Sequence, residues 1–409
     1  MSDHNYNIWW GPPRKFSAKI AERKISWLEL FYDLVYVIVI SRITHYLVEH
    51  PQGVGLLDYA FLFAMTFWGW YNGSMYHDLH GTPGIRTRFM TLWQMMAAGA
   101  FAVTLDSSGN MVYRATCALL FLQLFITYLW WSVGIYDKNH RKLNRPYTIC
   151  FLLAFALLIA TLWIPLPYQR IVFWVALLLN YFPFTLTAYR LKKRGTDLSL
   201  SANMTERLGL FMIIVFGESI LGVINSVGHL KEMNFMVWFC FGMGILIVFA
   251  LWWIFFSNIA DRHVKKGMTA GNRVSFIYIP ALASLGMTGA AFPALLEKLS
   301  ANETTHSGSL QIIYGVSIAL FLCCVTALSR FLVYPAEYDK PKKFMQPFLI
   351  VIAGVNLLLL LLFSMLPLFV YLLCVFASLL IVIISMTRTW FRVELNKMQE
   401  NIQEEISQE

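Results

Sequence analysis

Several apolar stretches of this chain contain ionisable side chains, and the first stretch is the most polar. Glu29 and Asp33 lie four positions apart in it, so both carboxylates share one face of a helix. Two carboxylates so close together resist ionising at the same time, and we therefore expect a shared proton or a bound cation there. Arg42 and His45 follow on roughly the opposite face. Arg42 therefore needs a counter-charge from another segment.

A third acid, Glu218, stands near the middle of a later apolar stretch, with polar Ser219 beside it and Asn225 two turns on. Two nearby glycines permit a neighbouring helix to approach closely, namely Gly217 and Gly222. One interpretation is a buried acid on a transport path. The other is a structural ion pair between Glu218 and Arg42. The residue types alone do not decide between the two.

The pattern of the remaining polar residues gives no enzyme signature. The 9 histidines are scattered, so neither a metal site nor a cofactor is expected, and no residue is assigned a catalytic role. Gly217-Glu218-Ser219 begins like a nucleophile elbow, but Leu221 replaces the glycine that the motif requires. A smaller polar cluster follows the tryptophan-rich segments and consists of Asn72, His77, Asp78 and Asp261.

The composition fits only a membrane protein. Charged residues make up 13% of the 409-residue chain and hydrophobic residues 58%, whereas soluble domains carry about 25% charged residues. The apolar residues come in blocks of roughly 20, the length that crosses a hydrocarbon core as a helix. Because lipid offers the backbone no hydrogen-bond partner and the blocks lack strand alternation, we expect an all-α integral membrane protein.

Twelve transmembrane helices are expected, each close to the ~20 residues that a span needs. They are placed at 27–48, 54–76, 89–107, 111–136, 147–165, 169–189, 207–227, 234–257, 274–296, 310–333, 347–366 and 368–390. Residues 1–26 form an N-terminal segment, residues 191–206 a basic and polar loop, and residues 391–409 an amphipathic tail. Both termini are expected in the cytoplasm.

The distribution of basic residues supports this topology. With the N-terminus inside, 27 Lys and Arg residues fall on the inner side and four in the outer loops, as the positive-inside rule requires. The net charge of +9 is therefore explained by orientation in the membrane, and nucleic acid is not expected as a partner.

Two stretches about 180 residues apart resemble each other. The tryptophan-rich segment around Trp68 parallels the one around Trp252, and the span that begins at Glu29 parallels the one that begins near Glu206. The partners are an even number of spans apart, so the halves share one orientation. We therefore expect two parallel six-helix repeats, 27–190 and 207–390, an arrangement found in transporters.

Two of these stretches carry a resemblance to a known family. The run from Glu29 to Val37, followed by Thr44-His45, resembles the opening motif of the low temperature requirement A (LtrA) family. The run from Glu206 to Phe211, continuing to Gly217-Glu218-Ser219, resembles the second motif of that family. The resemblance extends from about Ile25 to about Trp390. It implies a multi-pass protein of the cell membrane, and it implies no particular substrate. The family pattern has an uncharged polar residue where this chain has Arg42, so a pair with Glu218 would not be general.

Three classes of function follow from these features. The first is a transporter or channel for a small solute or ion, proton-coupled through Glu218 or the pair Glu29 and Asp33. The second is a membrane-embedded enzyme that acts on lipid from the inner-face residues His77, Asp78 and Asp261. The third is a scaffold or sensor without transport activity. The first is preferred, with the lipid bilayer and an unknown solute as partners, and a homo-oligomer stays open.

The topology predicts which loops a membrane-impermeant thiol reagent reaches. In a cysteine-free background, single cysteines in the loops around Gly53, Ser108 and Asn302 are expected to react in intact cells. Cysteines around Lys142, Lys192 and Lys265 should react only after the membrane is permeabilised, because basic loops stay on the inner side. Labelling of the Lys192 loop from outside would contradict the predicted topology.

Overall fold

The computed structural model is all-helical in the part of the chain that it describes, which is residues 11–15, 24–51, 53–82, 84–105, 111–138, 141–166, 168–193, 199–228, 234–260, 262–301, 307–362 and 367–408. This part contains twelve α-helices and one 3₁₀ helix, and its one β-type contact is an isolated bridge between Val264 and Leu332. The helices are α1 (Trp27–Glu49), α2 (Val54–His80), α3 (Ile85–Leu105), α4 (Met111–Tyr136), α5 (Arg141–Ala160), α6 (Tyr168–Lys193), α7 (Ala202–Gly228), α8 (Phe235–Ile259), α9 (Met268–Ala301), α10 (Ser307–Ser329), η1 (Ala336–Tyr338), α11 (Asp339–Leu362) and α12 (Leu368–Gln408).

Ten of the α-helices are long and apolar enough to cross a membrane, and α2 and α3 are the two that fall outside this group. The reason for α2 is its position. It contacts α1, α3, α4 and α6, and almost every residue from Tyr59 to His80 is buried. A helix enclosed by other helices does not need an apolar surface, so α2 carries polar residues that a lipid-facing helix excludes.

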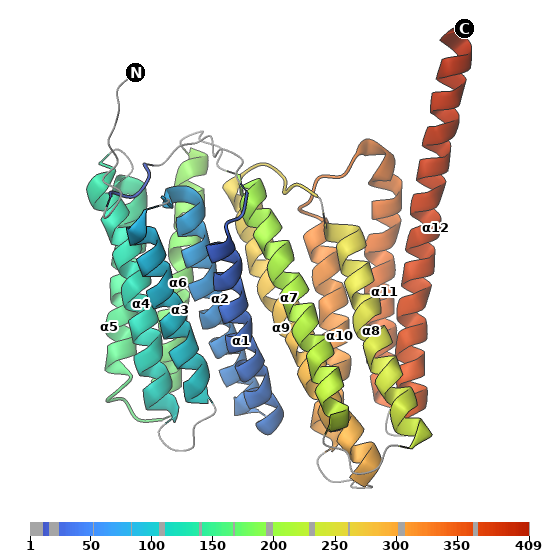
Figure 1. Ribbon diagram of the computed structural model, residues 1–409, viewed down its shortest axis with the longest axis horizontal. Coiled ribbons are helices and arrows are strands. Elements are labelled where there is room, and N and C mark those ends of the chain that lie inside the picture. Colours follow the sequence, from blue (N-terminus) through green and yellow to red (C-terminus); the bar gives the residue numbers. More distant parts are fainter. Residues whose placement is uncertain are drawn as a thin grey trace. The chain divides into compact units, whose positions relative to one another are not determined.

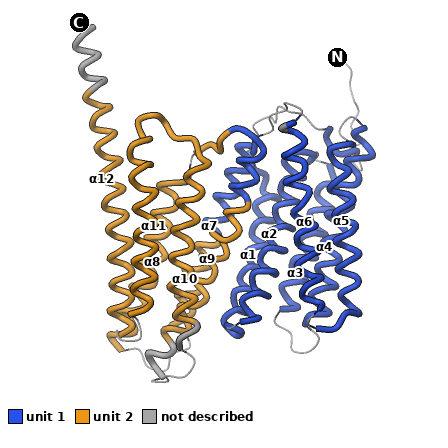
Figure 2. The backbone as a smooth tube through the Cα atoms, turned by 180° about the vertical axis from the view of Figure 1, so that it is seen from behind, with its two compact units in different colours: residues 1–214, 266–275 blue, residues 215–265, 276–409 orange. Residues whose placement is uncertain are grey.

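The chain divides into two compact units (Figures 1 and 2). The first comprises Met1–Ile214 and Lys266–Ser275, and therefore contains α1 to α6 together with the beginnings of α7 and α9. Within it the helices α3, α4, α5 and α6 contact one another in chain order. The division falls inside α7 and not in the preceding loop. The relation of the two halves by a repeat stays a prediction.

The second unit comprises Val215–Lys265 and Phe276–Glu409. In it α10 packs against α8 and α11, and α12 packs against α8 and α11. The segments of α7 and α9 in this unit approach closely, because a Cβ atom added to Gly222 would lie 2.7 Å from the Gly289 carbonyl oxygen. The expectation of close packing is therefore confirmed for Gly222. It is not met for Gly217, because among the described residues no atom of another segment lies within 4 Å of such a Cβ.

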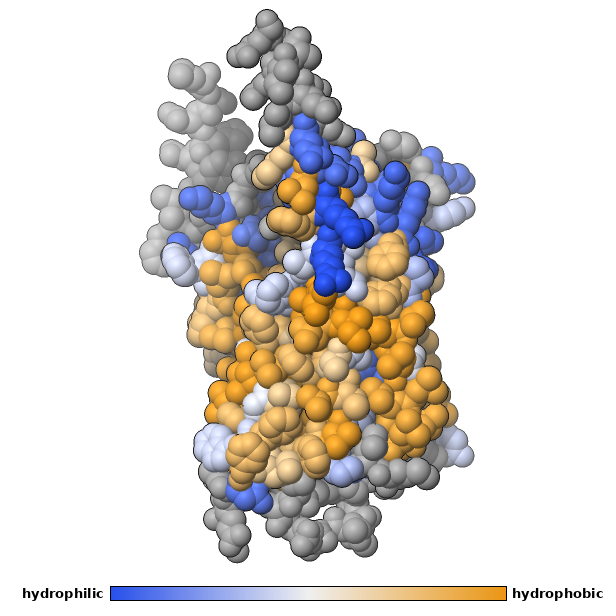
Figure 3. All heavy atoms as spheres, turned by 90° about the vertical axis from the view of Figure 1, so that its right-hand side faces the viewer, coloured by the Kyte–Doolittle hydropathy of each residue, from blue (hydrophilic) through white to orange (hydrophobic). Residues whose placement is uncertain are grey.

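The last helix is one continuous element from Leu368 to Gln408. The predicted tail thus extends the last predicted span without a break, and Phe391, Leu395 and Met398 are exposed along it. Seen from the side of α12, apolar side chains form a broad band and hydrophilic side chains gather toward one end (Figure 3). Such a band is what a lipid-facing surface requires.

Candidate functional site

The site begins at the first turn of α1. The Ser26 hydroxyl accepts a hydrogen bond from the Glu29 backbone N–H, and the Glu29 carboxylate accepts one from the Ser26 backbone N–H at 3.0 Å. This reciprocal capping box fixes where the helix begins. Asp33 follows one turn later on the same face. Glu29 and Asp33 are 3% and 0% exposed, so the predicted pair of carboxylates is buried as well as adjacent.

A buried arginine of α7 lies between the two carboxylates. Arg207 is 0% exposed, and its Nε–H donates to Asp33 Oδ2 at 3.3 Å while its Nη2 also bonds the other oxygen of Asp33. The Arg207 Nη1 lies 3.5 Å from Glu29 Oε1. The contact with Asp33 is therefore bidentate, the geometry in which guanidinium and carboxylate bind most strongly. The contact with Glu29 is longer.

Aromatic side chains enclose this ion pair. Trp70 of α2 donates its indole N–H to Asp33 Oδ1 at 2.7 Å. The Arg207 guanidinium lies 5.9 Å from the ring centres of both Trp70 and Tyr32, and Trp70 stacks on Phe211 with centroids 4.4 Å apart. The aromatic faces attract the cation and exclude water. We call Glu29, Tyr32, Asp33, Trp70 and Arg207 the α1–α7 charge cluster.

The cluster brings two buried carboxylates to one buried guanidinium. Asp33 binds the arginine through both of its oxygens. The Glu29 carboxylate contacts the arginine at a longer distance and also accepts hydrogen bonds from the Ser26 backbone N–H at 3.0 Å and the Ser26 hydroxyl at 2.9 Å. The two carboxylates therefore have different surroundings.

A network of neutral polar groups adjoins the cluster. The Tyr32 hydroxyl lies 3.2 Å from the Tyr36 hydroxyl, the Gly69 carbonyl oxygen and the Gln94 side-chain oxygen. His77 lies with its ring centre 6.0 Å from that of Tyr32, and its Nε2 is 2.8 Å from the Thr91 hydroxyl. These groups extend polar contacts from the cluster into the core of the first unit.

Three members of the predicted inner-face cluster, Asn72, His77 and Asp78, lie on α2, and each has a partner outside the cluster. The Asp78 carboxylate accepts hydrogen bonds from Ser201 at 2.6 Å and from Asn203 at 3.0 Å. Asp78 thus binds the start of α7, where negative charge is stabilising. Asn72 is fully buried and donates to the Trp68 carbonyl oxygen at 2.9 Å. Asp261 lies outside the described residues.

The other predicted path residues lie elsewhere. Arg42 and His45 are exposed on α1 of the first unit, while Glu218, Ser219 and Asn225 belong to the second unit. Ser219 is buried, and its hydroxyl lies 3.0 Å from the Val215 carbonyl oxygen and 3.2 Å from that of Leu285 on α9. Glu218 is half-buried and Asn225 is exposed. The pair of Arg42 with Glu218 stays a prediction.

A known protein family matches most of this chain. The sequence profile of the bacterial low temperature requirement A protein (LtrA) matches residues 24–387, which include every residue of the charge cluster. The chain belongs to the LtrA family. The resemblance seen in the two motifs is thereby confirmed, and with its apolar helices the chain is a polytopic membrane protein. An uncharacterised protein of Rhizobium meliloti (strain 1021) is 24% identical over 257 residues, which cover 60% of this chain. The chain spans 61% of the length of that relative.

Sequence reasoning missed Arg207 in this LtrA family member. Arg207 stands at the expected start of the seventh span and was counted among the basic residues of the inner side. A signal was present, because Glu29 and Asp33 near the inner end of one span require a cation at the same depth. Arg207 is placed about five residues into α7, which gives it a similar depth from the same side. Pairing the two carboxylates with a cation at the same depth in the membrane would have identified Arg207.

The cluster predicts a large loss of stability when the cation alone is removed. Replacing Arg207 with Met leaves two buried carboxylates without their partner, a change that costs about 3–5 kcal/mol. The matched control is Arg170→Met. Arg170 pairs with Asp58 at 3.1 Å but is 36% exposed, so its loss should cost less than about 1 kcal/mol. Thermal unfolding in detergent would measure both variants, and equal melting temperatures would contradict a buried ion pair.

Proposed function

We propose that this LtrA family protein is a transporter or channel for a small solute or ion in the cell membrane, and that the α1–α7 charge cluster is its proton-responsive centre. The proposal includes twelve membrane-crossing helices with both termini in the cytoplasm. The observation that carries it is a pair of buried carboxylates, Glu29 and Asp33, that share one buried arginine.

The chemistry of the cluster supports a switch between two charge states. In the proposed switch, the cluster attracts a cation when both carboxylates are ionised. When Glu29 takes up a proton, Asp33 and Arg207 balance each other and the attraction is lost. Glu29 lies in the first turn of α1, so a proton would have only a short distance to travel from the end of the helix. Proton uptake at Glu29 would thus be linked to release of a cation, and proton release to its binding. If the transported ion is the proton, Glu29 itself would carry it.

The alternatives rest on weaker observations. A lipid-modifying enzyme would use His77 and Asp78 at the inner face, but both are engaged within the protein, with Thr91 and with the start of α7. A scaffold or sensor needs no buried charge at all. The absence of a catalytic residue, metal and cofactor, and the formation of a homo-oligomer, stay predictions.

Proton flux into liposomes tests the proposal. Purified protein is reconstituted with a pH-sensitive dye inside, and a potassium gradient with valinomycin drives protons inward. We expect acidification well above that of empty liposomes, and a reduction of about tenfold or more in Glu29→Gln. Glutamine at this position preserves the capping box, so the helix should begin at the same place while the ionisable group is gone.

The control is Glu206→Gln, the same substitution at an exposed acid next to Arg207. It should leave the flux unchanged, and both variants should elute as the same single species in size-exclusion chromatography. Flux equal to that of empty liposomes for the wild-type protein would refute proton coupling. A well-folded Glu29→Gln protein with normal flux would exclude the charge cluster as its centre.

A further inference from the structure

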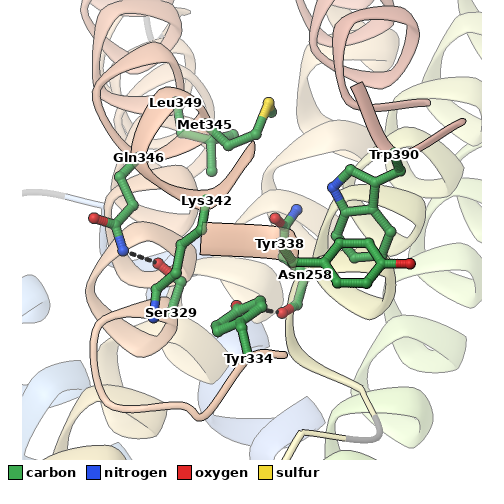
Figure 4. Close-up of a pocket in the computed structure, with 9 residues that line it drawn as sticks. All are labelled: Asn258, Ser329, Tyr334, Tyr338, Lys342, Met345, Gln346, Leu349 and Trp390. Atoms are coloured by element: carbon green, nitrogen blue, oxygen red, sulfur yellow. Dashed lines mark hydrogen bonds between the residues drawn. The ribbon is translucent and has the colours of Figure 1, made fainter. Parts of the chain in front are cut away.

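The second unit has a small pocket between the ends of α8 and α10, the beginning of α11 and the middle of α12 (Figure 4). Its volume is about 10 Å³, room for roughly one water molecule. The side chains that line it include Ser329, Tyr334, Tyr338, Lys342, Gln346 and Trp390. The pocket is thus polar and aromatic on a molecule whose exposed surface is largely apolar, and it is too shallow to enclose a complete small molecule.

Two cations adjoin the aromatic rings of this pocket. The Lys342 ammonium lies 4.2 Å from the ring centre of Tyr334 and donates one hydrogen bond, to the Leu332 carbonyl oxygen at 3.3 Å. The Arg262 guanidinium lies 5.1 to 5.5 Å from the ring centres of Tyr334, Tyr338 and Trp390. The Nε of Arg262 is buried and has no hydrogen-bond partner among the described residues. Lys342 therefore keeps donors for an anion in the pocket, and Arg262 adds a second positive charge beside it.

The described acids near these cations form no ion pair with them, although Asp339 is close enough to act on the Lys342 ammonium electrostatically. In the described part of the chain neither Arg262 nor Lys342 forms an ion pair with a carboxylate. Glu394 accepts a hydrogen bond from the Tyr338 hydroxyl, and the Glu337 carboxylate lies 3.8 Å from the Lys397 ammonium. Burial raises the pKa of the Tyr334 phenol to about 12, although Arg262 opposes this shift. Tyr334 is therefore uncharged at neutral pH, and the pocket keeps a positive charge that attracts an anion.

Position in the membrane indicates the source of the anion. The pocket lies where helices end, and tryptophan and tyrosine at such positions mark the boundary between hydrocarbon and water. Large apolar side chains close to it in sequence are exposed, with Phe344 at 52% and Phe391 at 62%. Hydrophilic side chains gather at one end of the apolar band on this face (Figure 3). An anion bound here would have water on one side and hydrocarbon on the other.

We propose that an anionic phospholipid binds over this pocket, with one phosphate oxygen in the small cavity. The phosphate oxygens accept hydrogen bonds from Lys342, Arg262 adds positive charge beside the pocket, and the acyl chains lie along the exposed apolar surface of α11 and α12. Basic pockets between helices recognise lipid head groups by this combination of charge and adjoining hydrocarbon. A free phosphate shares the head group chemistry but lacks the chains.

The test compares two neighbouring lysines of the full-length protein in detergent. Native mass spectrometry would measure the affinity for added phosphatidylglycerol. Lys342→Gln and Lys343→Gln each remove one positive charge, and Lys343 is exposed. We expect Lys342→Gln to weaken binding by about tenfold more than Lys343→Gln, a difference that a specific ionic contact readily supplies. Lys342→Arg should retain the affinity of the wild-type protein.

Two further ligands, phosphatidylcholine and inorganic phosphate, distinguish a phospholipid site from other causes of binding. Phosphatidylcholine should bind equally to all variants, and excess inorganic phosphate should not displace phosphatidylglycerol. Equal weakening by Lys342→Gln and Lys343→Gln would mean general surface attraction and would overturn the proposal. Displacement by inorganic phosphate alone would overturn the assignment to lipid. Melting curves without added lipid would confirm that Lys342→Gln is folded, and Arg262→Gln provides a second variant that should weaken binding in the same way.

Discussion

The buried positive charge of Arg207 is the constraint on which the first unit depends. Arginine stays protonated in proteins, so a fully buried guanidinium cannot escape its cost by losing a proton, and it must be balanced by negative charge. Asp33 supplies that charge through two contacts and Glu29 through a third. The requirement fixes the face that α1 presents, the depth at which α7 enters the unit and the position of the Trp70 indole.

The same constraint accounts for the composition of α2. Its side chains complete the surroundings of the ion pair through Trp70, and its end holds the first turn of α7 through Asp78. A helix that makes these contacts carries polar side chains. The cost of exposing them to lipid does not arise, because other helices surround α2. Low hydropathy in α2 is therefore a consequence of its central position. The charge cluster and the helix that supports it are parts of one arrangement within the first unit.

The sequence was sufficient to predict the class of fold and the number of helices, because apolar block length and the distribution of basic residues follow directly from the bilayer. It also predicted that Glu29 and Asp33 share a face, since helical periodicity decides that locally. It did not reveal their partner, because periodicity gives the face of a helix and not its neighbour. Residues 202–206 looked like a loop, whereas Ser201 caps α7 and the helix begins at Ala202. Gly217 and Gly222 are equally small, and only packing distinguishes them.

A double-mutant cycle on Asp33 and Arg207 tests the central claim most directly, because it isolates the interaction from the cost of each substitution. The free energy of unfolding would be measured for Asp33→Leu, Arg207→Met and the double variant. If the two groups form one buried ion pair, replacing both with apolar side chains should recover most of the stability that either single change removes, with a coupling of about 2–3 kcal/mol. Destabilisations that simply add in the double variant would contradict the account.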